Sequence, residues 1–186
     1  MIAEIETAII DRIKSAAGMK YLRAVESYGG QLDEEINDVV RVLPAVWVTF
    51  AGTGKPVQQG ENRFIKPATF AVMCGARSVR SERTTRQDGP AGEVGAYRIL
   101  QDVETLLLMQ DFGLAIDYFR PGAVRTLYNT RLRNNGLAVF AQEWHTKYVV
   151  TKPTDDEVDF LRVGLNYNLK PGDDNPDASD LVTLQG

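Results

Sequence analysis

His145 is the only histidine in the 186-residue chain, so it is the first side chain to consider for chemistry. An imidazole can act near neutral pH as a general base or as a metal ligand. In an extended strand, Glu143 and Lys147 would share the face of His145. No cysteine accompanies it, and no carboxylate has the spacing of a metal ligand. We therefore expect His145 to lie on a solvated or subunit-contacting face. An enzyme that uses His145 with Glu143 is the alternative.

A glycine-rich stretch at Gly52–Lys55 has some likeness to a phosphate-binding loop. That loop needs a first Gly, four residues, and then Gly-Lys-Ser/Thr at the start of a helix. Here Thr49 occupies the position of the first Gly, and Pro56 that of the hydroxyl residue. We therefore expect a polar hairpin tip without a bound cofactor, and we keep Lys55 as a candidate contact with a partner.

Four arginines make up the one basic cluster of the chain: Arg77, Arg80, Arg83 and Arg86. Guanidinium groups favour two-point contacts with carboxylates or phosphates, so this segment could bind an acidic neighbouring protein or a nucleic acid. The residues support equally the alternative of a soluble loop with spaced charges. No aromatic residue is interleaved with them, so stacking on single-stranded bases is not expected. All four arginines are candidate subunit or partner contacts.

Acidic residues gather towards the C-terminus, at 155–159 and 173–177. A calcium loop needs alternating carboxylates and a Gly at its sixth position, and Asp173 begins no such pattern. These residues therefore predict a solvated acidic segment, and we expect no metal site.

Composition narrows the class of protein further. A mass of 20.6 kDa and a hydrophobic fraction of 44% are ordinary for one soluble domain. Cys74 is the only cysteine, which excludes an intrachain disulfide and favours a reducing cytoplasm; on an apolar strand face it is expected to be a small buried side chain. No apolar run of about 18 residues is present, and the acidic, amphipathic first residues lead us to expect no signal peptide. The net charge of -4 disfavours a generic nucleic-acid binder.

The elements that must position these residues can be read from periodicity. The clearest is a strand at Leu137–Val150, in which Trp144 and its even-numbered neighbours share one face and His145 and its odd-numbered neighbours the other. A turn at Asn134-Asn135-Gly136 joins it to a partner strand at 123–132, after a turn at Arg120-Pro121-Gly122. We expect helices at 2–17, 31–42 and 93–110, and further strands at 21–28, 45–51, 63–77 and 160–169.

This order of elements predicts an α+β fold, with two to three helices packed on one face of a mostly antiparallel or mixed β-sheet. Pro67 lacks a ladder donor, so it implies an edge or a bulge in the strand 63–77. In the helix 93–110, the apolar stripe is expected to run through Val94, Tyr97, Leu100, Val103 and Leu107, and to be widened by Ile99, Leu106 and Met109. We expect a single domain at 1–170 and an acidic flexible tail at 171–186.

Several strings of the chain resemble the small tail proteins of Mu-like contractile phages, the Mu Gp37-type family, which are regarded as tail terminators. The similarity rests on an amphipathic first helix, on VRVLPAVWVTFAG at 40–52, on RFIKPATFAVMCGARS at 63–78, on the long helix at 93–110, and on FAQEWHTKYVV at 140–150. It covers nearly the full length of the chain.

The resemblance implies a tail-terminator-like α+β subunit without catalytic residues. Such a subunit would form a homo-oligomer, a hexameric ring that caps the tail tube and sheath and meets the head–tail connector proteins. It would be made in the cytoplasm of a bacterial host and end in the virion tail. The acidic balance suits a conduit that DNA must pass without sticking, and no membrane or sequence-specific nucleic-acid partner is implied.

Three classes of function therefore remain at this point. The first is a structural tail protein, either a terminator or a closely related head–tail connector (neck) protein. The second is a small enzyme built on His145. The third is a nucleic-acid-binding module built on the arginine segment.

Overall fold

The computed structural model describes residues 1–33, 36–77, 86–88, 94–127, 136–153, 162–167 and 178–183. The chain divides into two compact units, Met1–Thr151 and Lys152–Gly186. The division falls earlier than the boundary at residue 170 that the sequence predicts. Whether residues 171–186 move as a flexible tail in solution stays a prediction.

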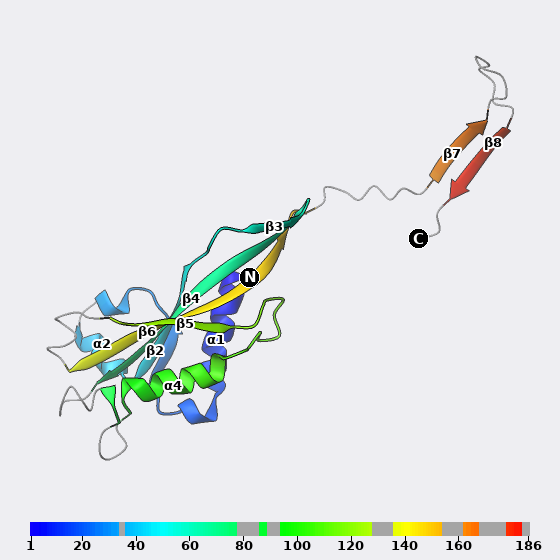
Figure 1. Ribbon diagram of the computed structural model, residues 1–186. Coiled ribbons are helices and arrows are strands. Elements are labelled where there is room, and N and C mark those ends of the chain that lie inside the picture. Colours follow the sequence, from blue (N-terminus) through cyan, green and yellow to red (C-terminus); the bar gives the residue numbers. More distant parts are fainter. Residues whose placement is uncertain are drawn as a thin grey trace. The chain divides into compact units, whose positions relative to one another are not determined.

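The first unit is built on a six-stranded sheet with the order β1-β2-β4-β6-β5, and β3 pairs with β4 beside this path (Figure 1). The strands β1 and β2 are parallel, and every other pair in this sheet is antiparallel. The strand bounds are Ala24–Ser27 (β1), Ala45–Gly52 (β2), Val57–Gly60 (β3), Arg63–Arg77 (β4), Arg120–Thr126 (β5) and Leu137–Thr151 (β6). The predicted α+β class with a mostly antiparallel, mixed sheet is confirmed.

The centre of the sheet is the pair β4–β6, which runs in register from Arg63↔Thr151 to Arg77↔Leu137. Both strands were expected almost at these bounds, because aromatic and β-branched residues dominate them. Gly136 has a φ of +66°, as a turn before β6 requires. The predicted turn residues Asn134 and Asn135 lie outside the described residues.

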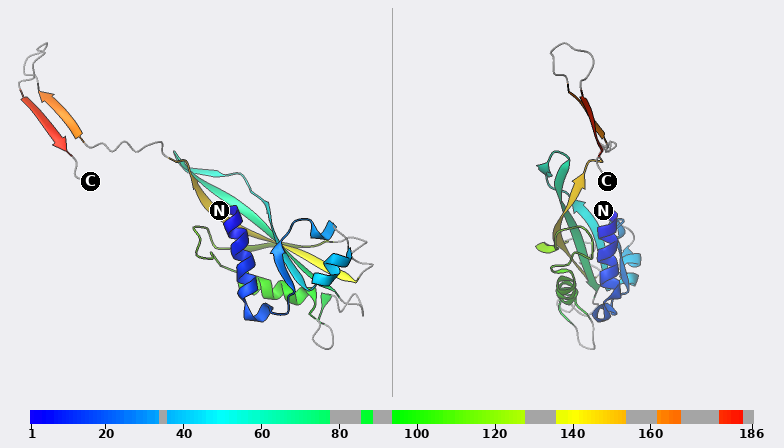
Figure 2. Two further views of the ribbon diagram at one scale, coloured as in Figure 1. Left: turned by 180° about the vertical axis from the view of Figure 1, so that it is seen from behind. Right: turned by 90° about the vertical axis from the view of Figure 1, so that its right-hand side faces the viewer.

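Two helices, α1 (Ile2–Ser15) and α4 (Ala96–Leu107), pack on one face of the sheet. The helix α1 contacts β1 and β2, α4 contacts β4 and β6, and the helices contact each other; Figure 2 shows both lying across the strands. The isoleucines Ile5, Ile9 and Ile13, spaced four residues apart on α1, are fully buried, as an amphipathic helix on a sheet requires. From Ala138 to Tyr148, every second residue of β6, including Trp144, points into this core.

The buried face of α4 follows the predicted broad stripe at most positions and departs from it at Tyr97. Its buried residues are Ala96, Ile99, Val103 and Leu107, whereas Tyr97 is 40% exposed. The ring of Tyr97 lies at the rim, with its centroid 5.2 Å from that of Phe140. The expected residues Val94, Leu100 and Leu106 are partly buried and pack against the same core.

A third helix, α2 (Ile36–Val42), follows a 3₁₀ turn at Gln31–Asp33 and contributes to the opposite face of the sheet. There Val39 and Leu43 pack on Trp47 of β2 and on Met73 of β4. The packing is close at Gly75, where an added Cβ would lie 2.8 Å from a Leu43 methyl and 2.9 Å from the Trp47 ring. The expected helix pair on one face is therefore present, and the third helix lies on the other face.

Two prolines depart from the simplest expectation. Arg120-Pro121-Gly122 forms no turn; it begins the edge strand β5, where Gly122 and Ala123 face the single residue Glu143 in a bulge.

Pro67 lies in a central strand, but on one side the pairing passes from β2 to β3 around it. On that side its carbonyl accepts a hydrogen bond from Thr53 Oγ1. Because N and O of one residue point the same way in an antiparallel pair, the missing N–H costs no ladder bond.

The second unit contains two antiparallel strands, β7 (Arg162–Tyr167) and β8 (Ala178–Thr183). The strand β7 lies within the predicted strand 160–169. The strand β8 lies in the segment where the sequence predicts a loose tail. Strand pairing depends on a partner distant in the chain, which the composition of the segment does not reveal.

Candidate functional site, an open charged sheet face

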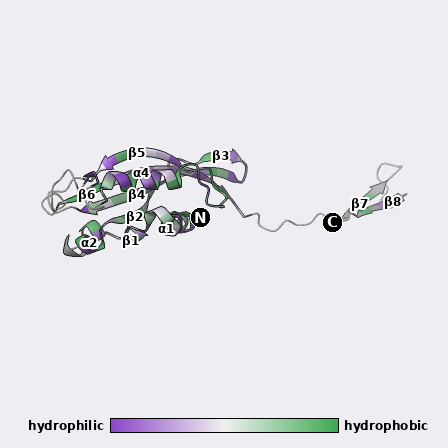
Figure 3. Ribbon diagram, turned by 90° about the horizontal axis from the view of Figure 1, so that it is seen from below, coloured by the Kyte–Doolittle hydropathy of each residue, from purple (hydrophilic) through white to green (hydrophobic). Residues whose placement is uncertain are grey.

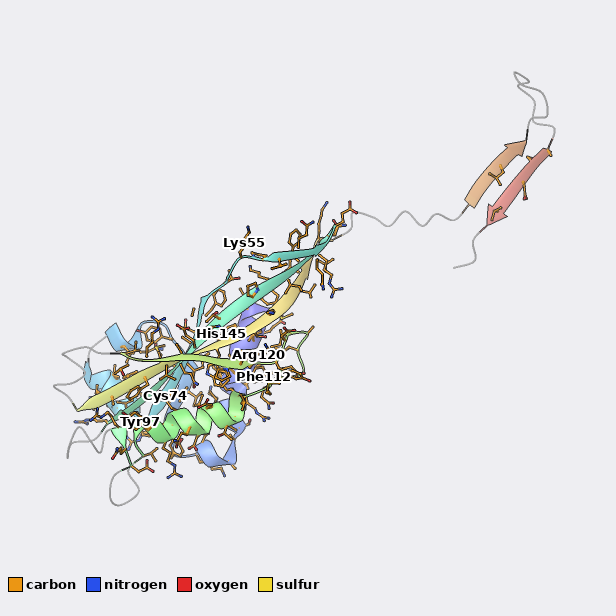
Figure 4. The ribbon with its side chains drawn as sticks, in the orientation of Figure 1. Lys55, Cys74, Tyr97, Phe112, Arg120 and His145 are labelled. Atoms are coloured by element: carbon orange, nitrogen blue, oxygen red, sulfur yellow. The ribbon has the colours of Figure 1, made fainter. Side chains whose placement is uncertain are left out.

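The odd-numbered side chains of β6 lie on the face opposite to α1 and α4, and at one end of β6 they are exposed. We use the name open charged face for the six described residues Thr69, Arg120, Arg125, Glu143, His145 and Lys147, which come from β4, β5 and β6. Direct pairing of His145 with Thr69 on one side and Arg120 on the other places these residues together. The hydrophilic ends of β5 are visible in Figure 3, and Figure 4 labels Arg120 and His145.

His145 is held by packing and by one hydrogen bond. Its Nδ1 lies 3.0 Å from Thr69 Oγ1. Its Nε2 lies over the bulge of β5, where a Cβ built on Gly122 would be 2.3 Å away. The bulge and the absence of a side chain at Gly122 therefore make room for the imidazole. His145 is exposed, as the sequence predicts for this strand face.

The His145–Glu143 arrangement that an enzyme would need is not assembled. Glu143 Oε1 lies 3.4 Å from Arg125 NH2, and His145 is bonded to a hydroxyl instead of a carboxylate. A general base is normally oriented by a group that stabilises its protonated form, and a threonine hydroxyl supplies no charge for this purpose. Among these described residues, the Thr69 hydroxyl and the His145 imidazole lie at hydrogen-bond distance, but no carboxylate is bonded to His145 to complete a catalytic triad.

The charge of this face is predominantly positive. Arg120, Arg125 and Lys147 are all exposed, and Glu143 is the one acidic member. In the part of the chain that the structure describes, neither Arg120 nor Lys147 forms a salt bridge. The ion pair between Arg125 and Glu143 joins side chains that are 73% and 31% exposed, so it contributes at most about 1 kcal/mol.

The arginine cluster is described only at its two ends. Arg77 is exposed at the end of β4, and Arg86 is half-buried, whereas Arg80 and Arg83 lie outside the described residues. The interface role that the sequence suggests for these four arginines therefore stays a prediction.

Asp88 has a role that the sequence does not reveal. It accepts a hydrogen bond from the backbone N–H of Gly95 at 3.0 Å, and its other oxygen lies 3.4 Å from Arg98 NH1. Both contacts are at the start of α4, where a carboxylate is favoured by the helix dipole. Asp88 therefore ties its segment to the first turn of α4. Because it lies seven residues before Gly95, the sequence alone does not mark it as a helix cap.

Lys55 is exposed in the connection between β2 and β3. This connection is followed by a strand, whereas a phosphate loop must open a helix. Gly52–Lys55 therefore lacks the helix that a phosphate loop opens, and it lies in an exposed connection along β4 instead of at the expected hairpin tip. The structure does not bring Lys55 and His145 into one contact, and the partner role of Lys55 stays a prediction.

The buried titratable groups are structural. Burial raises the pKa of the Cys74 thiol far above its ordinary value, so the thiolate is not accessible as a nucleophile.

Tyr21 links two elements of the first unit. Partial burial, and then the hydrogen bond to Asp102 at 2.7 Å, raise the pKa of Tyr21. Arg98 Nε lies 3.8 Å from the same Asp102 oxygen. Tyr21 thus links the segment after α1 to α4, a tie between residues 81 positions apart.

Two absences hold for the described residues alone. No group of three or more His, Cys, Asp or Glu side chains there is arranged to hold a metal ion. No helix there is long and apolar enough to cross a membrane. The acidic stretches at 155–159 and 173–177 lie outside the described residues.

Known proteins similar to this chain were found in two comparisons. The model of the family described as "Bacteriophage Mu, Gp37" matches residues 1–149 of this chain. A curated protein from Haemophilus influenzae, the Mu-like prophage FluMu protein gp37, is 24% identical over 188 aligned residues, which cover 100% of this chain and 90% of the relative. The family match runs from α1 nearly to the end of β6.

Proposed function

Because this chain belongs to the bacteriophage Mu Gp37 family, we propose that it is a structural protein of a Mu-like phage or prophage and that it terminates the tail. In this role, copies of the chain form a ring, hexameric in our proposal, on the head-proximal end of the tail tube and sheath. The other side of the ring meets the head–tail connector proteins. The protein is made in the host cytoplasm and ends in the virion tail.

The observation that carries this proposal is the family match over residues 1–149, which includes nearly all of the six-stranded sheet. The geometry of the described residues agrees with work by assembly instead of catalysis. His145 is engaged with Thr69, Glu143 with Arg125, and Cys74 is buried. An exposed face with three cations is a surface suited to contacts between subunits.

Deletion of the gene from an inducible Mu-like prophage tests the role in the particle. An uncapped tail tube can continue to add subunits, so loss of a terminator should give tails of abnormal length that do not join heads. Electron microscopy of induced lysates measures tail length, and expression of the chain from a plasmid is the control. Tails of normal length that lack heads would instead indicate a head–tail connector.

The purified chain provides a second test. Mass measurement should show a ring-sized oligomer, alone or with tail tubes, and electron microscopy should show it at tube ends. A protein that is monomeric under all conditions and never decorates tube ends would contradict the terminator role.

A further inference from the structure

The open charged face has an excess of positive charge that the described part of the first unit does not neutralise. Arg120 and Lys147 are exposed on the same side of neighbouring strands, and Arg125 is balanced only by Glu143. Val149, which is 40% exposed, follows Lys147 on the same face of β6. Such a face favours an acidic partner held by contacts that salt can screen.

The charges of the chain are divided unequally between its two units. Residues 152–186 contain eight acidic and three basic side chains, whereas residues 1–151 contain 17 acidic and 18 basic side chains. The second unit is therefore an acidic module, and the first unit is close to neutral with a basic face. A second copy of the chain thus supplies an occupant of matching charge.

The second unit would also gain stability from contact with a partner surface. Its described strands β7 and β8 form a two-stranded sheet, and isolated two-stranded sheets are at best marginally stable in water. Leu165 and Val182 are 42% and 43% exposed. Leu165 pairs with Asp180, and Val182 is two residues further along the same strand, so all three share one face. This face combines exposed apolar area with a carboxylate.

We propose that residues 152–186 of one copy bind the open charged face of the next copy. The proposal rests on the ring-forming function proposed above and names the two unlike surfaces that would meet in the ring. Contacts of this head-to-tail kind close into a ring if the rotation between subunits allows it. The occupant is a second copy of this chain; DNA, whose phosphates could bind the same cations, is the rival occupant.

Two full-length variants with reversed charges test this contact. The face variant carries Arg120→Glu and Lys147→Glu. The tail variant carries Asp173→Lys, Asp174→Lys, Asp177→Lys and Asp180→Lys, which change the net charge of residues 152–186 from -5 to +3. Each variant alone presents like charges on both surfaces, so its self-association should fall roughly tenfold or more at 0.1 M salt. Sedimentation or light scattering measures the mass over a range of protein concentrations.

A mixture of the two variants gives the decisive measurement. The reversed face of one variant is then opposite in charge to the reversed tail of the other, and the two unreversed surfaces also match. An equimolar mixture should therefore recover the oligomer, with alternating subunits in an even-numbered ring. Raising the salt to 1 M should weaken the wild-type contact, because the screening length falls from about 10 Å to about 3 Å.

The control for net charge is Lys14→Glu with Lys20→Glu, two exposed lysines outside the open charged face. It should assemble like the wild type, and thermal melting checks that every variant is folded. Wild-type assembly by the face variant, or a mixture of folded variants that remains monomeric, would overturn the proposal while leaving ring formation itself intact. DNA binding that the face variant loses without a change in oligomer mass would also overturn it. A wild-type protein that never self-associates would overturn both this contact and the proposed function.

Discussion

The two faces of β6 use alternating residues of one strand for opposite purposes. Trp144 is fully buried against Phe119, with ring centroids 6.1 Å apart, and points into the core under α1 and α4. The next residue, His145, is exposed and contacts Thr69 and the bulge at Gly122. The comparison teaches that a buried and an exposed residue are separated by a single step along the chain. Changes at buried residues of either face should therefore affect folding, whereas changes at the exposed residues should, in our proposal, affect assembly.

Trp144→Ala should have the largest effect. Removal of a fully buried indole leaves a cavity beside Phe119, and such changes cost about 3–5 kcal/mol of unfolding free energy. Urea unfolding followed by circular dichroism measures the loss. A cost below about 1 kcal/mol would contradict the assignment of this face to the core.

Gly75→Ala should have the next largest effect, on the part of the other face that α2 covers. An added methyl would meet Leu43 and Trp47 at under 3 Å, and overpacking of this kind costs about 1–3 kcal/mol. Gly122→Ala is the matched variant in the uncovered part. Its methyl would meet the exposed His145 ring, which can move, so it should cost less by the same urea measurement, and His145→Ala should relieve part of that cost.

Tyr21→Phe should cost about 0.5–1.5 kcal/mol at pH 7, because it removes the hydrogen bond to Asp102 beside the helix-covered core. The pKa of Tyr21 is raised in the folded protein, so its contribution is complete below the unfolded value near 10 and is lost as the pH rises above it. Thermal melting from pH 7 to 11 should therefore show a smaller alkaline loss for Tyr21→Phe than for the wild type. Equal alkaline losses would exclude Tyr21 as the source.

His145→Ala and Lys147→Ala should have the smallest effect on folding. Both side chains are exposed, and surface substitutions usually change stability by less than about 0.5 kcal/mol. Differential scanning calorimetry of each variant at a fixed protein concentration checks this. A loss as large as that of Trp144→Ala would remove the distinction between the two faces.

Much of the fold follows from local patterns in the chain. The strands β4 and β6 and the helix α1 were predicted almost to their ends, because alternation and helical spacing are strong over 14 or 15 residues. The exposure of His145 and the burial of Cys74 followed from the same alternation. The start of β5 at Arg120, the exposure of Tyr97 on α4 and the strand β8 did not, since each depends on which partner packs or pairs there.

The candidate site shows the same limit. The types of its residues were visible in the sequence, but of the six members of the open charged face only His145 was selected as a candidate contact. The bulge that sets Arg120 opposite His145, and the pairing of Glu143 with Arg125, join β5 and β6 through geometry that spacing does not encode.

The sequence by itself determined which residues alternate, which stripes are apolar and where acidic residues gather, because these properties are written in neighbouring positions. It also carried the strings that mark the family. Only the tertiary structure decided which strands pair, which face α2 covers and which of the described cations lie together without a salt bridge. The physical reason is that a strand has two edges and two faces of similar local energy, and the choice among them is made by residues far away in the chain.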